Sequence, residues 1–307
     1  MLSETILKLT IKGSGFLIGN TFITKILFVV RNIALARLLS PQDFGLISLS
    51  LVLIQGLRSL TAIGVEKYLL QRRDLNFKII GNAWSLSILR GAILTSLALI
   101  LYPLYSSLVH EPKSLAVLKI VAFIPLFEGM INPGVFLAER EIKFAKISLY
   151  ELISSILEVA FVILLALIVR DVPALAWGFI FAAALKTFLS FLFFKIPTTP
   201  QIHILEQIEL LSVAKLFIII SVGSLIMRYG DNFIIGSMLG VTELGFYIIA
   251  YQLAAFPVQI LRLVASRVAF PVISKLQIER NALKKAAYSI LQINLFIMSL
   301  SDNPNGF

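Results

Sequence analysis

Basic side chains recur inside long apolar stretches of this 307-residue sequence. Five of them could bind an anionic ligand: Lys25, Arg31, Arg58, Arg90 and Lys186. A charge at mid-bilayer costs about 3 kcal/mol on insertion scales, so it is expected to face a polar interior. There, lysine and arginine can replace water as partners of an anion, and arginine does so with a bidentate fork. We therefore take these five as candidate substrate-binding residues.

A second set of charges could serve in coupling to an ion or form pairs between helices. It comprises Glu128, Glu158, Arg228 and Asp231. Arg228 and Asp231 are three residues apart, so they share a helix face and could neutralise each other. An Arg31–Asp231 pair between the two halves of the chain is a further hypothesis. For all these charges the competing interpretation is ion pairing that only fixes helix packing.

The composition places the chain in a membrane. Hydrophobic residues make up 58% and charged residues only 14% of the sequence, which leaves too few charges to solvate a globular surface. Cysteine is absent and the two histidines are isolated, so neither a disulfide scaffold nor a metal site is expected. No Walker A sequence or nucleophile elbow occurs. We therefore expect no cofactor, no metal, no catalytic residue and no enzyme activity.

Apolar runs long enough to cross a bilayer follow one another along the chain. They cover about 14–36, 44–64, 80–104, 114–137, 147–169, 173–195, 211–236 and 243–266. A ninth run starts near Ala286 and reaches only Leu300. Pro125 and Pro133 are expected to kink or break the fourth run. The predicted fold class is an all-α polytopic membrane protein with about eight complete transmembrane helices.

The loop charges predict the orientation of these spans. Sixteen basic residues fall in the loops of one side and three in those of the other. The positive-inside rule then places the N-terminus in the cytoplasm. Most of the net charge of +10 is thereby explained by topology, and nucleic acid is not an expected partner.

An internal repeat appears when the chain is aligned with itself at an offset of 200 residues. Residues 32–50 then align with residues 232–250. Asn32, Leu39 and Gly45 meet Asn232, Leu239 and Gly245, and Asp43 meets Glu243. Six predicted spans separate the copies, an even number, so the two halves have the same orientation, as in transporters built from parallel repeats.

Three stretches carry a resemblance to a known family: ARLLSPQDFG, AIGVEKYLLQRRDL and GDNFIIGSMLGVTELGFYIIAYQLAAFP. They resemble the Wzx-type polysaccharide flippases of the multidrug/oligosaccharidyl-lipid/polysaccharide (MOP) exporter superfamily, which is related to the MATE transporters. The resemblance implies two six-helix lobes around a central cavity. Residues 1–196 would form the N-terminal lobe and residues 197–307 an incomplete C-terminal lobe, because the chain ends within its ninth run. Lys25 and Arg31 lie on the first span, which faces the cavity in the family.

The function implied by the resemblance is the movement of lipid-diphosphate-linked oligosaccharide repeat units across the bacterial inner membrane. The implied partners are a polyprenyl-diphosphate-linked oligosaccharide, membrane lipids, and the polysaccharide polymerase and glycosyltransferases of the same pathway. The products would be O-antigen, capsule or exopolysaccharide. Three alternatives stay open at this point: a cation-coupled multidrug exporter of the same superfamily, a membrane enzyme, and a C-terminally truncated remnant without transport activity.

Overall fold

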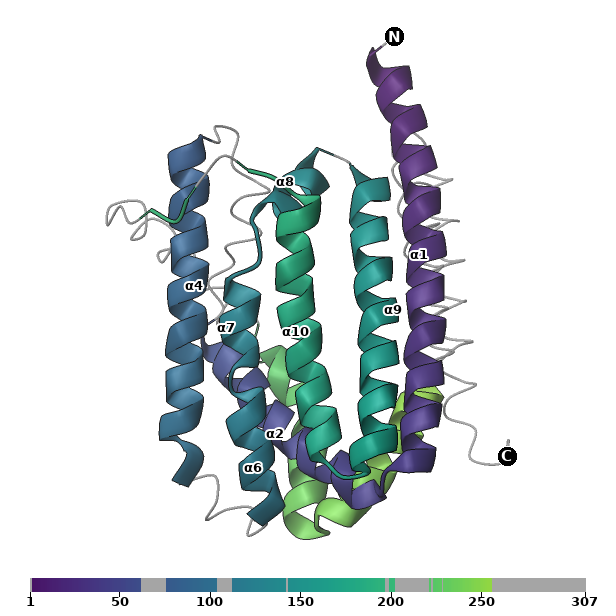
Figure 1. Ribbon diagram of the computed structural model, residues 1–307, viewed down its shortest axis with the longest axis vertical. Helices are drawn as coiled ribbons and strands as arrows, with labels where there is room; N and C mark the ends of the chain where they lie inside the picture. Colours follow the sequence, from purple (N-terminus) through teal and green to yellow (C-terminus); the bar gives the residue numbers. More distant parts are fainter. Residues whose placement is uncertain are drawn as a thin grey trace, which may run out of the picture. The chain divides into compact units, whose positions relative to one another are not determined.

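The computed structural model describes residues 2–61, 76–103, 112–141, 143–196, 199–201, 221, 223–227 and 229–255. Within these ranges every regular element is a helix (Figure 1). The helices are α1 (Leu2–Leu38), α2 (Pro41–Leu60), α4 (Phe77–Ile100), α6 (Pro112–Val121), α7 (Ile124–Gly129), α8 (Gly134–Arg140), α9 (Phe144–Val169) and α10 (Pro173–Phe193). A further apolar helix covers Val241–Ala255. The predicted all-helical class is confirmed for the described residues.

Three of these helices, α4, α9 and α10, are long and apolar enough to cross a membrane. A bent pair, Leu115–Gly129 and Gly134–Arg140, supplies a fourth span if it is counted as one. These elements coincide with the third to sixth predicted runs, and the first two runs fall on α1 and α2. Because runs 211–236 and 243–266 extend beyond the described residues, the count of eight spans stays a prediction.

By its internal contacts the chain divides into two compact units, residues Met1–Ala250 and Tyr251–Phe307. The division into lobes at residue 196 stays a prediction.

Two helices begin directly after recognisable capping residues. Ser40 caps α2, accepting a hydrogen bond from the Asp43 backbone N–H, while the Asp43 carboxylate accepts one from the Ser40 backbone N–H. This capping box, with Pro41 in the first turn, is a strong helix-start signal. Asn76 caps α4 through a 2.8 Å bond from the Ile79 N–H. Local chemistry thus determines where α2 and α4 begin.

Helices α9 and α10 run in opposite directions. The Tyr150 hydroxyl on α9 donates to the Lys186 carbonyl on α10 at 2.9 Å, and Val162 of α9 packs directly against Gly178 of α10. As the residue numbers increase along α9, the numbers of the contacting residues on α10 decrease, so the two helices are antiparallel. Figure 1 shows them side by side. Consecutive crossings of a membrane require this alternation. The cytoplasmic N-terminus and the inner-membrane location stay predictions.

An exposed ion pair links the start of the fourth predicted span to the loop between the fifth and sixth. Lys113 Nζ lies 3.0 Å from Asp171 Oδ1. The hydrogen bond from Lys113 holds the pKa of the Asp171 carboxyl below its ordinary value. Both residues belong to loops predicted on the outer face, and their contact agrees with that assignment to one face.

The fourth predicted span is broken, as its prolines predicted. Its helical axis turns by 54° between Leu115–Gly129 and Gly134–Arg140. Pro125 stands in the first turn of α7 and Pro133 directly before α8. Proline lacks a backbone N–H and cannot continue a helix without freeing carbonyls of the preceding turn. The sequence predicted the position of the break, and the structure shows that it produces three short helices.

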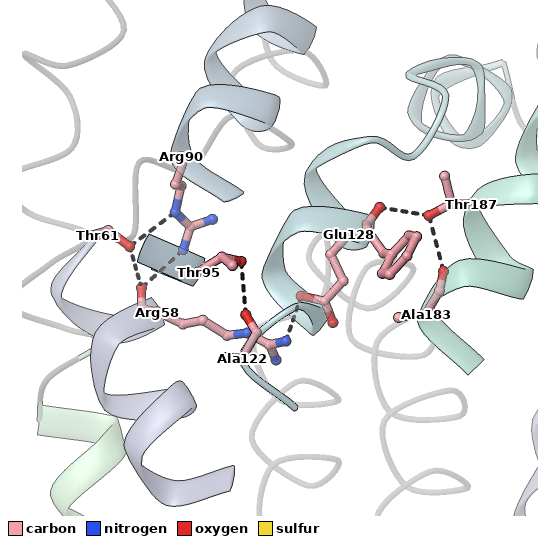
Figure 2. Close-up of polar contacts among 9 residues, drawn as sticks. Arg58, Thr61, Arg90, Thr95, Ala122, Glu128, Ala183 and Thr187 are labelled. Carbon is pink, nitrogen blue, oxygen red and sulfur yellow. Dashed lines mark hydrogen bonds and ion pairs between the residues drawn. The ribbon is translucent and has the colours of Figure 1, made fainter. Parts of the chain in front are cut away.

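Polar side chains of α4 and α10 satisfy backbone groups near the break. In hydrocarbon such groups must find partners within the protein. The pairs are Thr95 Oγ1 to the Ala122 carbonyl at 2.8 Å, Thr187 Oγ1 to the Phe127 carbonyl at 2.6 Å, and the Asn132 N–H to Ser190 Oγ at 2.9 Å. Figure 2 shows the Thr95–Ala122 contact. Hydroxyl groups therefore fasten the broken span to its neighbours.

We expect Thr187→Val to lower the free energy of unfolding by about 1 kcal/mol. Valine keeps the shape of threonine but removes the donor to the Phe127 carbonyl. The measurement is the unfolding midpoint of the detergent-solubilised protein. Thr24→Val is the matched control, because the Thr24 hydroxyl bonds only to the carbonyls of Asn20 and Thr21 within its own helix. Equal midpoint shifts for the two variants would contradict a role in fastening the break.

The backbones of α7 and α4 lie in close contact at two glycines. A Cβ atom at Gly91 would lie 2.4 Å from the Pro125 carbonyl oxygen, and one at Gly129 would lie 2.4 Å from the Ser87 carbonyl oxygen. Only glycine allows helices to approach this closely. Gly129 follows Glu128, so the contact also fixes the backbone that carries the Glu128 side chain.

The two copies of the internal repeat have the same local structure. In the first copy α1 ends at Leu38 and α2 begins at Pro41, with Ser40 at the turn. In the second copy the turn lies at Gly240, which is offset from Ser40 by 200 residues and has a φ of +96°. The following helix begins at Val241. Both windows therefore form the end of one helix, a short turn and the start of the next helix.

The two copies also contact each other reciprocally. A Cβ atom at Gly45 would lie 1.8 Å from the Val241 carbonyl oxygen, and one at Gly245 would lie 1.7 Å from the Pro41 carbonyl oxygen. Val241 is the counterpart of Pro41, just as Gly245 is the counterpart of Gly45. The contact therefore maps onto itself under the 200-residue offset, as a pseudo-two-fold axis requires. This symmetry supports the repeat more strongly than three sequence identities do.

Candidate functional site

A cavity of about 790 Å³ lies among α2, α4, α7, α9 and α10. Each of the five helices contributes one charged residue to its lining: Arg58, Arg90, Glu128, Glu158 and Lys186, in chain order. The volume is within the usual range of ligand sites. The structure thus brings together three of the five predicted cations and two of the predicted acids.

An ion pair joins α2 to α7 at the cavity wall. Arg58 Nη2 lies 2.7 Å from Glu128 Oε2 (Figure 2). The Arg58 side chain is 21% exposed and that of Glu128 is 45% exposed. A contact that is this accessible can be exchanged for a contact with a ligand.

Arg90 reaches from α4 to the end of α2. Its Nε donates to Thr61 Oγ1 at 3.2 Å and its Nη2 to the Arg58 carbonyl at 3.0 Å (Figure 2). The last carbonyls of a helix lack partners within the helix and carry partial negative charge, which a guanidinium stabilises. Arg90 therefore caps α2 and holds the turn that carries Arg58.

Three cations act on the Glu128 carboxylate. Besides Arg58, its ion-pair partner, both Lys186 and Arg90 interact with it electrostatically. They come from three helices, α2, α4 and α10. All three cations attract a negative charge at the Glu128 position.

The cations of the first span are placed differently. Arg31 Nη1 lies 2.6 Å from Glu158 Oε1 on α9, and the Arg31 side chain is only 12% exposed. Its guanidinium also lies 4.8 Å from the centre of the Phe28 ring. Lys25 Nζ is 5.9 Å from the centre of the same ring. Neither cation is among the residues that line the described cavity, although Glu158 is, and their binding role stays a prediction.

Asp231 has a partner other than the two proposed from the sequence. Its Oδ2 accepts a 2.5 Å hydrogen bond from the Tyr247 hydroxyl of the following helix. Arg31 pairs with Glu158, so the hypothesised Arg31–Asp231 pair is wrong for this structure. Arg228 lies outside the described residues.

Sequence reasoning missed the uncharged part of the lining. On α4 it includes Ala83 and also Trp84, Ser87, Gly91 and Leu94, the last four at intervals of three or four residues beside Arg90. Such spacing places side chains on one face of a helix. The signal was therefore present in the sequence, although the apolar residues around it concealed it.

Comparison with known proteins places the chain in a family. Residues 34–299 match the family model of polysaccharide biosynthesis proteins. The lipopolysaccharide biosynthesis protein WzxC of Escherichia coli K12 is 24% identical over 292 residues, covering 92% of this chain and 58% of WzxC. The teichuronic acid biosynthesis protein TuaB of Bacillus subtilis 168 is 21% identical over 73% of this chain and 47% of its own length. The chain thus spans about half to three fifths of these relatives.

Solved structures show the same fold. A MOP superfamily transporter from Pyrococcus furiosus has a TM-score of 0.57 at 14% identity and covers 94% of this chain, which in turn covers 70% of it. The inward-facing structure of a multidrug resistance MATE family transporter has a TM-score of 0.54 at 14% identity, with 90% and 69% coverage. The chain belongs to the polysaccharide biosynthesis protein family and has the fold of the MOP superfamily transporters.

Proposed function

We propose that the protein moves lipid-diphosphate-linked oligosaccharide repeat units across the bacterial inner membrane for O-antigen, capsule or exopolysaccharide synthesis. The observation that carries the proposal is the convergence of Arg58, Arg90 and Lys186 on one cavity. A diphosphate loses its hydration on entering a low-dielectric site, and fixed cations replace that water. The names of WzxC and TuaB support the same pathway context.

In this proposal the residues of the cavity have different roles. Arg58 and Lys186 bind the diphosphate, and Arg90 holds Arg58 in place through the end of α2. Polar and aromatic lining residues such as Gln55, Ser87 and Phe179 contact the sugars, while the polyprenyl tail stays in the bilayer. Transport follows when the lobes rock about the contact between the repeats. The polysaccharide polymerase and the glycosyltransferases of the same pathway would be its functional partners.

The second candidate, a cation-coupled multidrug exporter, is favoured by the structural likeness to a MATE transporter. Such a protein needs free acids in its cavity to attract cationic drugs. Both acids that line the described cavity are instead paired with arginines, Glu128 with Arg58 and Glu158 with Arg31. The lining favours an anionic ligand.

The proposal is tested by expressing the chain in a flippase-deficient bacterial strain and measuring the polysaccharide that reaches the cell surface. We expect Lys186→Gln to reduce surface polysaccharide at least about tenfold, because a charge-assisted contact to phosphate contributes about 1.5–3 kcal/mol. Lys195→Gln, an exposed lysine just after α10, is the matched control and should export normally. Absence of export from the unaltered chain, or equal export from both variants, would overturn the proposal.

A further inference from the structure

The described cavity contains an anion of its own. Glu128 projects from α7 toward Arg58, and its carboxylate pairs with Arg58 at 2.7 Å (Figure 2). Arginine binds carboxylate and phosphate with the same planar fork. The Glu128 carboxylate therefore occupies a position that suits the phosphate of a ligand.

The second ion pair of the cavity provides a contrast. The Arg31 and Glu158 side chains are only 12% and 16% exposed, so this pair is largely buried although Glu158 lines the cavity. Glu128 is 45% exposed, and its partner Arg58 also lines the cavity. Replacing the partner of a shielded charge leaves that charge uncompensated, whereas an accessible carboxylate can turn toward water. The geometry suits Arg31–Glu158 to packing and Arg58–Glu128 to exchange.

The backbone around Glu128 is held firmly, so the exchange needs only a side-chain movement. Gly129 presses against α4, and Thr187 holds the Phe127 carbonyl. The backbone of Glu128 is thus held in place on both sides, through Phe127 and Gly129. Its three side-chain torsions are enough to move the carboxylate away from Arg58.

We propose that Glu128 is a tethered counter-anion, which neutralises Arg58 in the empty cavity and is displaced when a phosphate of the ligand binds Arg58. This inference rests on the proposed function and adds a release step to it. When the ligand leaves, the carboxylate returns to Arg58 and competes against rebinding. The competition keeps affinity low enough for release, which any transport site requires.

Protonation of Glu128 removes the competitor. The charged groups that face it are Arg58 from α2, Arg90 from α4 and Lys186 from α10. Glu158 of α9 lines the same cavity but is paired with Arg31. Acidification therefore strengthens phosphate binding to the wild-type protein relative to a variant without this carboxylate. The ratio of the two affinities cancels the titration of the ligand itself.

Calorimetric titration of the purified chain with farnesyl diphosphate tests the inference. Glu128→Gln should tighten binding about five- to tenfold at neutral pH, since an accessible ion pair contributes roughly 1 kcal/mol. This advantage should shrink on acidification. Glu141→Gln, which removes an exposed carboxylate paired with Lys143, should bind like the wild type. Equal or weaker binding by Glu128→Gln would overturn the inference.

A second variant guards against misfolding. Glu128→Asp keeps the charge but withdraws the carboxylate by one methylene, and it should tighten binding by a smaller factor. If Glu128→Gln is not monodisperse, equal or weaker binding by Glu128→Asp overturns the inference. Equal, measurable binding by the wild type and both variants would refute the counter-anion while leaving the proposed function intact. No binding by any of them would refute both.

Discussion

Gly45→Ala should lower the free energy of unfolding by more than about 3 kcal/mol, because the new methyl group meets backbone that cannot move aside. A Cβ atom there would lie 1.8 Å from the Val241 carbonyl oxygen. Gly245→Ala should cost as much, since its Cβ would lie 1.7 Å from the Pro41 carbonyl oxygen. Thermal unfolding of the detergent-solubilised protein measures both effects.

Gly19→Ala is the matched control. A Cβ atom at Gly19 meets nothing within 4 Å, so the substitution should stabilise α1 slightly through the higher helix propensity of alanine, by up to about 1 kcal/mol. The predicted effects of the same change at Gly45 and Gly19 thus have opposite signs. A loss of stability at Gly19 matching that at Gly45 would refute the explanation by close approach.

The reciprocal contact also predicts non-additivity. Once one substitution has forced the two helix starts apart, the second methyl group meets less resistance. The Gly45→Ala/Gly245→Ala double variant should therefore lose clearly less stability than the sum of the single losses. Strict additivity would mean that the two glycines occupy independent sites and do not form a single symmetric contact.

The sequence was informative about elements and much less so about their rotation. Proline positions predicted the broken fourth span, whereas the second apolar run was predicted to start at residue 44 and α2 begins at Pro41, after its Ser40 cap. A helix in a bilayer is apolar on both its lipid face and its packed face. Hydropathy therefore could not say which side of the first span faces a cavity, and Arg31 instead meets Glu158 on α9.

The candidate site was predictable as a set of residue types but not as a set of contacts. Arg58, Arg90 and Lys186 were predicted as binding residues because they lie inside the apolar runs. All three line the described cavity. Their separate roles depend on distances across three helices. Arg90 caps α2 only because its guanidinium reaches the Arg58 carbonyl, 32 residues earlier in the chain. No spacing rule along one helix encodes that contact.

Arg58→Gln should weaken binding of farnesyl diphosphate by about 30- to 100-fold, since it removes a charge-assisted contact worth about 2–3 kcal/mol. It also leaves Glu128 without its ion-pair partner, so part of any loss could reflect lower stability. Arg37→Gln, at the exposed end of α1, is the matched control and should bind normally.

The Arg58→Gln/Glu128→Gln double variant separates these two causes. Removing both charges leaves no uncompensated carboxylate, so the unfolding midpoint should recover toward that of the wild type. Binding should stay weak, because the cation that receives the phosphate is still absent and removal of a competitor cannot replace it. Recovery of stability without recovery of binding assigns Arg58 to the ligand. Recovery of both would make the Arg58–Glu128 pair a packing element and leave Lys186 to bind the phosphate.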